Sequence, residues 1–167
     1  MEAVIAAGIF AMVFAGLYAV SDRAKRLVSQ GELAADVQRN CLGRIEQLRS
    51  YGWAKVSSPS AIATMLATPT TSSTTFTKEV VTVYLVDLPQ TTPLPTPAPT
   101  TTAVSTTPLF TVTKDGTNAP VISPAGFDPN TSVVQRALNF RVYTQTVGTT
   151  QSYERELSTV IAKSASR

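Results

Sequence analysis

Histidine is absent from this chain of 167 residues, and cysteine occurs only once, as Cys41. These absences remove the usual zinc sites, the Ser-His-Asp and Cys-His nucleophilic arrangements and the histidine general base. Glu154 and Glu156 are the closest carboxylate pair in the C-terminal half, and their alternation fits the solvated side of a strand. We therefore expect no enzymatic activity, no catalytic residue, no metal site and no cofactor.

A strong charge of either sign is also missing. The formal net charge is only +3, and no basic stripe is interleaved with aromatic residues, so the sequence gives no indication of a nucleic-acid partner. Cys41 has no partner for an intrachain disulfide. Its place among apolar residues at helical spacing predicts that it packs in the core as a small hydrophobe. The length allows one modest domain.

What the chain has instead is a long apolar run near its start. Residues 3–20 (AVIAAGIFAMVFAGLYAV) carry no charge and have about the length that an α-helix needs to cross a bilayer. Met1 and Glu2 supply no positive charge, which a cleavable secretory signal would need. Small residues are common in membrane spans, but at steps of four they also let helices approach closely. They are Ala3, Ala7, Ala11, Ala15 and Ala19, with Gly8 and Gly16 alongside.

The helical pattern continues beyond this run to Tyr51 without a proline. Its length predicts one helix of about 50 residues, roughly 75 Å long. A kink or local melting is expected near Gly31, because glycine is a poor helix former. Apolar residues recur at intervals of three, four and seven, as on an amphipathic helix, and charged residues such as Arg44 fall mostly off this stripe. The stripe consists of Leu27, Ala34, Val37, Cys41, Ile45 and Leu48.

The second half of the chain is rich in threonine, proline and β-branched residues. Residues 75–88 are the strongest predicted strand, with apolar residues on both faces, as in a central strand that is covered on two sides. Residues 109–114 predict another strand, and residues 133–147 and 152–162 predict an antiparallel hairpin around Gly148. Three or four antiparallel strands packed on the amphipathic helix would make a two-layer α+β fold.

Two further segments complete the predicted organisation. Residues 61–67 predict a helical turn or two, and residues 90–108, almost entirely threonine, proline and alanine, predict an extended surface loop. That loop is either a disordered linker or an O-glycosylated stalk, with Thr100, Thr101 and Thr102 as candidate sugar sites. The predicted parts are an apolar helix over 1–22, its amphipathic continuation over 23–53 and a β-rich globular region over 54–167.

A glutamate followed by an apolar helix, an amphipathic helix and a small threonine-rich sheet resembles the type IV pilin and pseudopilin superfamily. Residues 2–10 (EAVIAAGIF) resemble the stretch that begins at the glutamate of the prepilin cleavage and methylation motif. Residues 45–53 (IEQLRSYGW) are similar to the end of the long helix in many minor pilin-like proteins. The resemblance implies a pilin-like fold and a structural subunit of a pilus or pseudopilus filament, with major pilin, minor pilin and pseudopilin all open.

The same resemblance implies partners and locations. Subunits would wait in the inner membrane, be trimmed by a prepilin peptidase and be assembled by a dedicated machinery into an extracellular filament or a periplasmic pseudopilus. Glu2 would pair with the N-terminal amine of a neighbouring subunit, because a carboxylate in apolar surroundings is costly without a partner. The implied subunit interface consists of Met1, Glu2, Ala3, Ala7, Gly8, Phe10, Ala11, Ala15 and Ala19.

A single-span membrane protein with a small binding domain that does not polymerise is the alternative. The basic residues Arg23, Lys25 and Arg26 follow the apolar run, and by the positive-inside tendency they would keep the globular region in the cytoplasm. A basic leader ahead of Glu2 would reverse that orientation. For Glu2 itself, the alternative to pairing is a helix N-cap role, in which the carboxylate meets the first amides of the helix.

Overall fold

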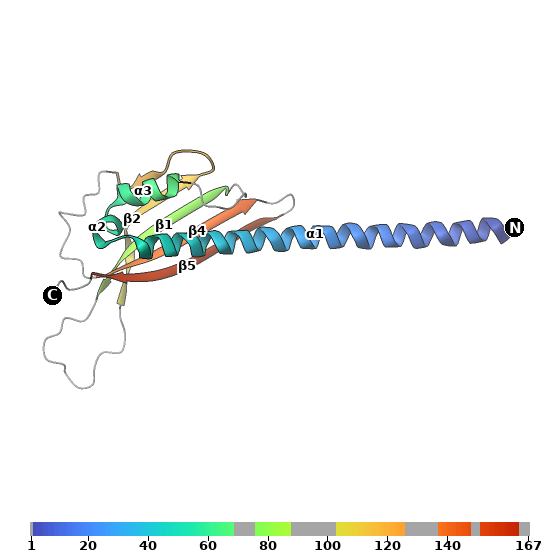
Figure 1. The fold of residues 1–167 in the computed structure, drawn as a ribbon, viewed down its shortest axis with the longest axis horizontal. Coiled ribbons are helices and arrows are strands. Elements are labelled where there is room, and N and C mark those ends of the chain that lie inside the picture. The colour runs from blue at the N-terminus through green and yellow to red at the C-terminus, as the bar shows by residue number, and fades with distance from the viewer. Residues whose placement is uncertain (1, 69–75, 88–102, 126–136, 148–150, 164–167) are drawn as a thin grey trace, which may run out of the picture.

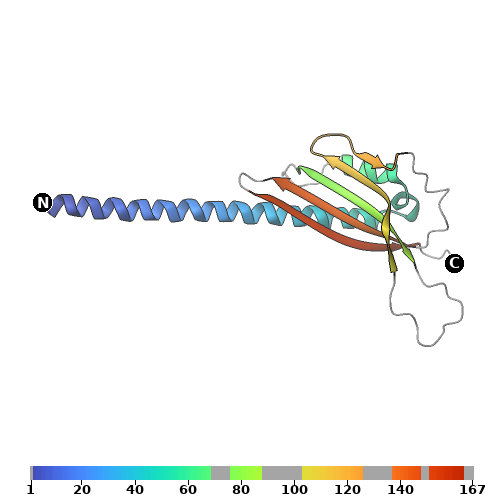
Figure 2. The ribbon, with the colours of Figure 1, turned by 180° about the vertical axis from the view of Figure 1, so that it is seen from behind.

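The computed structural model of the chain describes residues 2–68, 76–87, 103–125, 137–147 and 151–163. A long helix, α1, spans Glu2–Ser50, which is 49 residues. Its N-terminal half projects away from a small globular part, and its C-terminal half lies against a sheet (Figure 1). The single long helix predicted from the sequence is confirmed, and it runs straight through Gly31 without the expected kink (Figures 1 and 2).

Two short helices follow the end of α1. The chain turns at Gly52 into α2 (Trp53–Val56), and α3 spans Pro59–Ala67. Pro59 occupies the first turn of α3, where its missing amide hydrogen costs no helical hydrogen bond. The nine residues of α3 make it longer than the predicted turn or two, and its buried residues are Pro59, Ile62, Met65 and Leu66.

The described residues include five strands: β1 (Lys78–Asp87), β2 (Ala103–Asp115), β3 (Val121–Ser123), β4 (Ala137–Val147) and β5 (Ser152–Ala162). They form one sheet in the order β3-β2-β1-β4-β5, in which every pairing is antiparallel. The predicted C-terminal hairpin is confirmed, with Val147 opposite Ser152 at its turn. The sequence predicted three or four strands. Strand β3 was not predicted, because its three residues are too few to give a periodic signal.

Strand β2 begins earlier than predicted, at Ala103 rather than Leu109. Its first residues fall within the segment that was assigned to the threonine- and proline-rich loop. Pro108 lies inside β2 opposite Tyr84 of β1, and the pairing of the two strands shifts register at Tyr84. A proline has no amide hydrogen for the ladder, so a local irregularity is what allows it inside a paired strand.

The helices cover one face of the sheet and so make two layers. Helix α1 lies over β4 and β5, and α3 lies over β2 and β3 (Figure 2). The predicted two-layer α+β fold is therefore confirmed. The core between the layers is formed by side chains from both, chiefly Cys41, Leu48, Ile62, Leu66, Val81, Val83, Phe110, Val112, Leu138, Phe140 and Val142.

The central strand β1 is buried on one face only. Its side chains alternate, with Val81 and Val83 fully buried under the helices while Val80 and Thr82 stay partly exposed. The expectation that this strand is covered on two sides is wrong, because every described helix packs on the same side of the sheet. The β-branched residues of the other face satisfy strand propensity without being buried.

Candidate assembly helix and its anchor on the sheet

The N-terminal half of α1 is bare on every side. From Ile5 to Val20 all side chains are exposed, and the large ones include Phe10 at 65% and Tyr18 at 82%. By length and composition, α1 has a segment that is apolar enough to cross a membrane, and none of that segment is buried within the chain. A helix that is apolar all round needs a lipid or protein environment to cover it.

The structure places the predicted interface residues on this bare segment. Ala7, Gly8, Phe10, Ala11, Ala15 and Ala19 are all exposed, and the globular part lies far from them (Figure 1). Glu2 and Ala3 belong to the first turn of α1, but their side chains, and Met1 as a whole, lie outside the described residues. Among the described residues, no second helix or strand covers this surface.

A short stretch beyond the apolar run carries a basic collar, formed by Arg23, Lys25 and Arg26. Arg26 forms an exposed ion pair with Asp22, at 2.9 Å between Nη2 and Oδ2. Leu27 follows the collar and is 62% exposed, so its assignment to the packed stripe is wrong. The amphipathic pattern begins ahead of the part of α1 that lies against the sheet. Its apolar side chains are buried only from Val37 onward.

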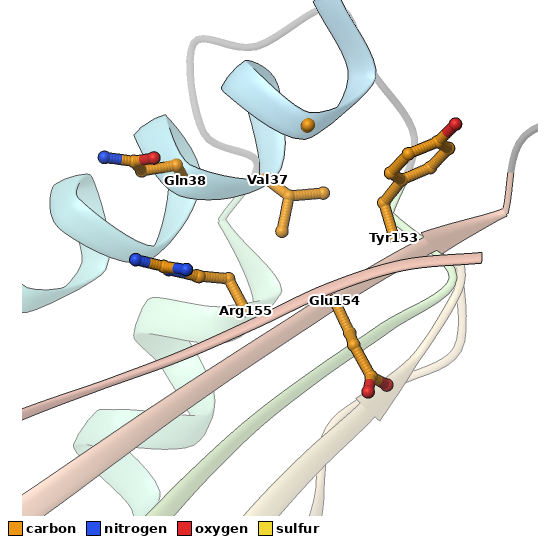
Figure 3. A pocket seen from close by; sticks show the side chains of 6 residues that line it. Val37, Gln38, Tyr153, Glu154 and Arg155 are labelled. Carbon is orange, nitrogen blue, oxygen red and sulfur yellow. The ribbon is translucent and has the colours of Figure 1, made fainter. Parts of the chain in front are cut away.

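A cavity of about 150 Å³ marks the place where α1 leaves the sheet. It lies between α1 and the start of β5, with Val37 at its centre and Gln38 and Arg155 along one side (Figure 3). The side chain of Glu154 points away from it, towards the other face of the sheet (Figure 3). Tyr153 forms the opposite wall, and its buried hydroxyl has no hydrogen-bond partner among the described residues.

A buried polar network fixes α1 on the sheet. Glu79 of β1 accepts a hydrogen bond from Arg44 Nε at 3.0 Å and another from Asn40 Nδ2 at 2.9 Å. Asn40 also donates to Thr144 Oγ1 of β4 at 3.1 Å, and Lys114 of β2 lies 3.7 Å from the second carboxylate oxygen of Glu79. The carboxylate of Glu79 thus joins the long helix to β1 and β2, and Asn40 joins it to β4.

Arg44 also holds α3. Its Nη1 donates to the carbonyl of Met65 at 2.8 Å, and its Nη2 donates to the carbonyl of Thr68 at 3.1 Å. These carbonyls belong to the C-terminal end of α3, where a cation is favoured by the helix dipole. Arg44 is 1% exposed, so its placement among the off-stripe charges is wrong. Arg44 lies three residues after Cys41 and four before Leu48, and this spacing could have predicted that it shares their buried side of the helix.

Cys41 lies beside this network in the core, as predicted. It is fully buried, and its Sγ lies 3.4 Å from the carbonyl oxygen of Arg155 on β5. Burial raises the pKa of the Cys41 thiol above its ordinary value, since the thiolate would lose its hydration. The thiol is therefore protonated and inaccessible at neutral pH.

The opposite face of the sheet carries exposed polar pairs. Tyr143 of β4 donates a hydrogen bond to Glu154 of β5 at 2.7 Å, and this bond raises the pKa of Tyr143 to about 12. Arg141 stacks on the ring of Tyr84, 4.7 Å from its centroid, and lies 3.8 Å from Glu156. The prediction that Glu154 and Glu156 form a solvated strand face is confirmed by their exposure.

Thr100, Thr101 and Thr102, the candidate sugar sites, lie outside the described residues. Among the residues that are described, no three cysteine or acidic side chains gather as metal ligands would. No protein-family model, no curated protein and no solved structure matches this chain.

Proposed function

We propose that the protein is a structural subunit of a type IV pilus-like or pseudopilus filament. The observation that carries this proposal is the bare, membrane-length half of α1, which continues as one rigid helix into a half that is fixed to a sheet. An apolar helix of this kind is stable in lipid before assembly and among other such helices afterwards. The subunit would reside in the inner membrane and then in an extracellular filament or a periplasmic pseudopilus.

The resemblance of residues 2–10 to the prepilin motif supports the same function. In this proposal Glu2 pairs with the N-terminal amine of a neighbouring subunit and sets the axial position at which subunits dock. The partners are further copies of this chain or related subunits, a prepilin peptidase and an assembly machinery. Head-to-tail contacts that do not close on themselves produce filaments of this type. The protein has no enzymatic role in this proposal.

The experiment that tests the proposal is mass spectrometry of the N-terminal peptide in a sheared cell-surface fraction. We expect the subunit in that fraction, with a trimmed or methylated amine ahead of Glu2. Glu2→Ala should reduce the sheared fraction strongly while leaving the unfolding of the globular part unchanged. Glu32→Ala is the matched control, because Glu32 is an exposed carboxylate on the same helix, beyond the apolar run. A chain with an unprocessed start, found only in detergent-extracted membranes, would favour the single-span anchor.

A further inference from the structure

Strand β5 leaves one edge of the sheet open. It is the last strand in the order β3-β2-β1-β4-β5, and β4 is its only strand partner among the described residues (Figure 1). The pairing with β4 runs from Ser152 to Ala162 without a shift in register. At about 3.3 Å per residue, the free edge of β5 is roughly 36 Å long. It presents a row of backbone amide and carbonyl groups with which another strand can pair.

The opposite edge of the sheet is protected, and the edge at β5 is not. Natural proteins prevent unwanted pairing with very short edge strands, prolines and bulges. Strand β3 has only three residues, and the part of β2 that extends beyond β3 contains Pro108. Strand β5 has 11 residues, no proline, glycine or lysine, and no register shift. The edge of β5 is therefore suited to accept a further strand.

The cavity between α1 and β5 opens beside the same edge. Three of the residues that line it, Ala34, Gln38 and Arg155, are exposed, so the cavity is reached from solvent. Its volume of about 150 Å³ is close to that of a protein cavity that binds benzene. Side chains of an added strand alternate between the two faces of the sheet. The side chain opposite Arg155 would lie on the face covered by α1, beside this cavity.

The charges along β5 define which strand fits. Arg155 lies on the side of α1, whereas Glu154 points to the other face of the sheet (Figure 3). Arg155 forms no ion pair with any described residue, so an acidic side chain opposite it is favoured. Basic side chains are favoured opposite Glu154 and Glu156, which are exposed on the other face. Strands with like charges at these positions are repelled, so the charges select the partner.

A second copy of β5 does not fit this edge. Antiparallel pairing of two β5 strands needs a twofold axis normal to the sheet, and that axis would reverse the direction of α1. The two membrane-length segments would then point in opposite directions. Parallel pairing about a twofold axis along the strands would turn side chains at the same height to opposite faces, which a pleated sheet does not allow. A segment of a different protein meets neither restriction.

We propose that the edge of β5 binds an extended segment of another protein by β-strand addition, and that the segment carries an acidic residue between two basic ones. Backbone hydrogen bonds would hold the segment along the edge. Its acidic side chain would lie at the cavity beside Arg155 and Gln38, and its basic side chains would lie opposite Glu154 and Glu156. This inference goes beyond the proposed filament function and does not depend on it.

The test is binding of a fluorescent peptide to the full-length chain in detergent, measured by anisotropy. The probe is Thr-Val-Lys-Glu-Lys-Val-Thr, blocked at both ends, and we expect a Kd below about 1 mM. Two further peptides carry N-methyl groups on alternate amides, which removes hydrogen-bond donors and leaves the charges unchanged. In an added strand only every second residue directs its backbone groups to β5. We therefore expect one methylated peptide to bind several-fold more weakly than the other.

A charge reversal tests where the peptide binds. Arg155→Glu should weaken binding of the probe several-fold, and a peptide with lysine at its centre should bind this variant more tightly than the probe does. Arg23→Glu is the matched control, because Arg23 is also exposed and the change in net charge is the same. It should bind the probe like the unmodified chain. The fluorescence of Trp53 checks that both variants unfold as the unmodified chain does.

Each alternative outcome overturns the inference. Equal binding of the two methylated peptides would mean that the backbone does not pair along an edge, and this comparison needs no variant to fold. Equal losses for Arg155→Glu and Arg23→Glu would mean that the peptide responds only to net charge. A probe that does not bind at about 1 mM would leave the edge without the proposed partner. None of these results changes the sheared fraction, which tests the filament function separately.

Discussion

Helix α1 has two halves with the same backbone and opposite surroundings. Ile5–Val20 are exposed all round, whereas Val37–Leu48 are buried along one side by β4, β5 and a polar network. In the second half the sheet stabilises the helix through tertiary packing. The first half has no such support from the described residues. A bilayer or other apolar helices would supply an environment in which internal hydrogen bonding favours a helix. One element is therefore packed on a sheet at one end and exposed at the other.

The largest expected effect comes from removing the carboxylate that joins the second half to the sheet. Glu79→Leu leaves the buried Arg44 without its ion pair, and breaking such a pair typically costs about 3–5 kcal/mol. The free energy of unfolding is measured in detergent from the fluorescence of Trp53, which packs against the core. Glu32→Leu, at an exposed position of α1, should change the free energy of unfolding little. A loss below about 1 kcal/mol for Glu79→Leu would contradict the central role of this network.

A charge placed in the bare half should weaken membrane insertion and not the stability of the globular part. Val13→Arg is expected to weaken membrane insertion by about 2.5–3.5 kcal/mol, because it places a cation at the centre of the apolar segment. The unfolding of the globular part should stay as it is. The checks are the fraction that remains in carbonate-washed membranes and the Trp53 unfolding curve. Val28→Arg lies beyond the segment and should insert normally; equal losses for both variants would show that the segment boundary is misplaced.

Gly31→Ala should separate subunit stability from assembly. Alanine favours the helix by about 1 kcal/mol, and the added methyl group has open space within the chain. We therefore expect greater helix stability in detergent, measured by circular dichroism. We also expect a smaller assembled fraction, because small residues such as Gly31 let neighbouring helices approach closely. A variant that gains stability and assembles normally would mean that no helix approaches at Gly31.

Cys41 should report on the packed half without altering it. Its burial and raised pKa predict that a thiol reagent reacts only when the globular part opens. The reaction rate should therefore rise in the Glu79→Leu variant by the same factor as the population of unfolded chains. Rapid modification of the native chain would contradict the packing of α1 on β5.

The smallest effect is expected on the exposed face of the sheet. The hydrogen bond to Glu154 raises the folded pKa of Tyr143 to about 12, above the usual value of 10. The stability that this shift contributes is complete below pH 10 and is lost as the pH rises towards 12. Glu154→Gln should lower the pKa of Tyr143 in an ultraviolet titration, with little effect on the free energy of unfolding at neutral pH. An unchanged titration would contradict this hydrogen bond.

The sequence by itself determined the long helix, its apolar and amphipathic halves and the C-terminal hairpin. These features follow from local periodicity and from the absence of proline between Ala3 and Tyr51. Both are properties of neighbouring residues, so they can be read along the chain. The position of Cys41 in the core followed from the same pattern. The solvent exposure of Glu154 and Glu156 also followed from the sequence, because side chains alternate between the two faces of a strand.

Tertiary structure alone decided which charges are buried and which face of the sheet is covered. Arg44 is charged, so its residue type predicts exposure, yet Glu79, Met65 and Thr68 from distant parts of the chain supply the partners that allow its burial. Leu27 is apolar and on the stripe, yet it stays exposed, because no strand of the described residues covers it. Burial depends on what a side chain meets in space, and that information is distributed over residues far apart in the sequence.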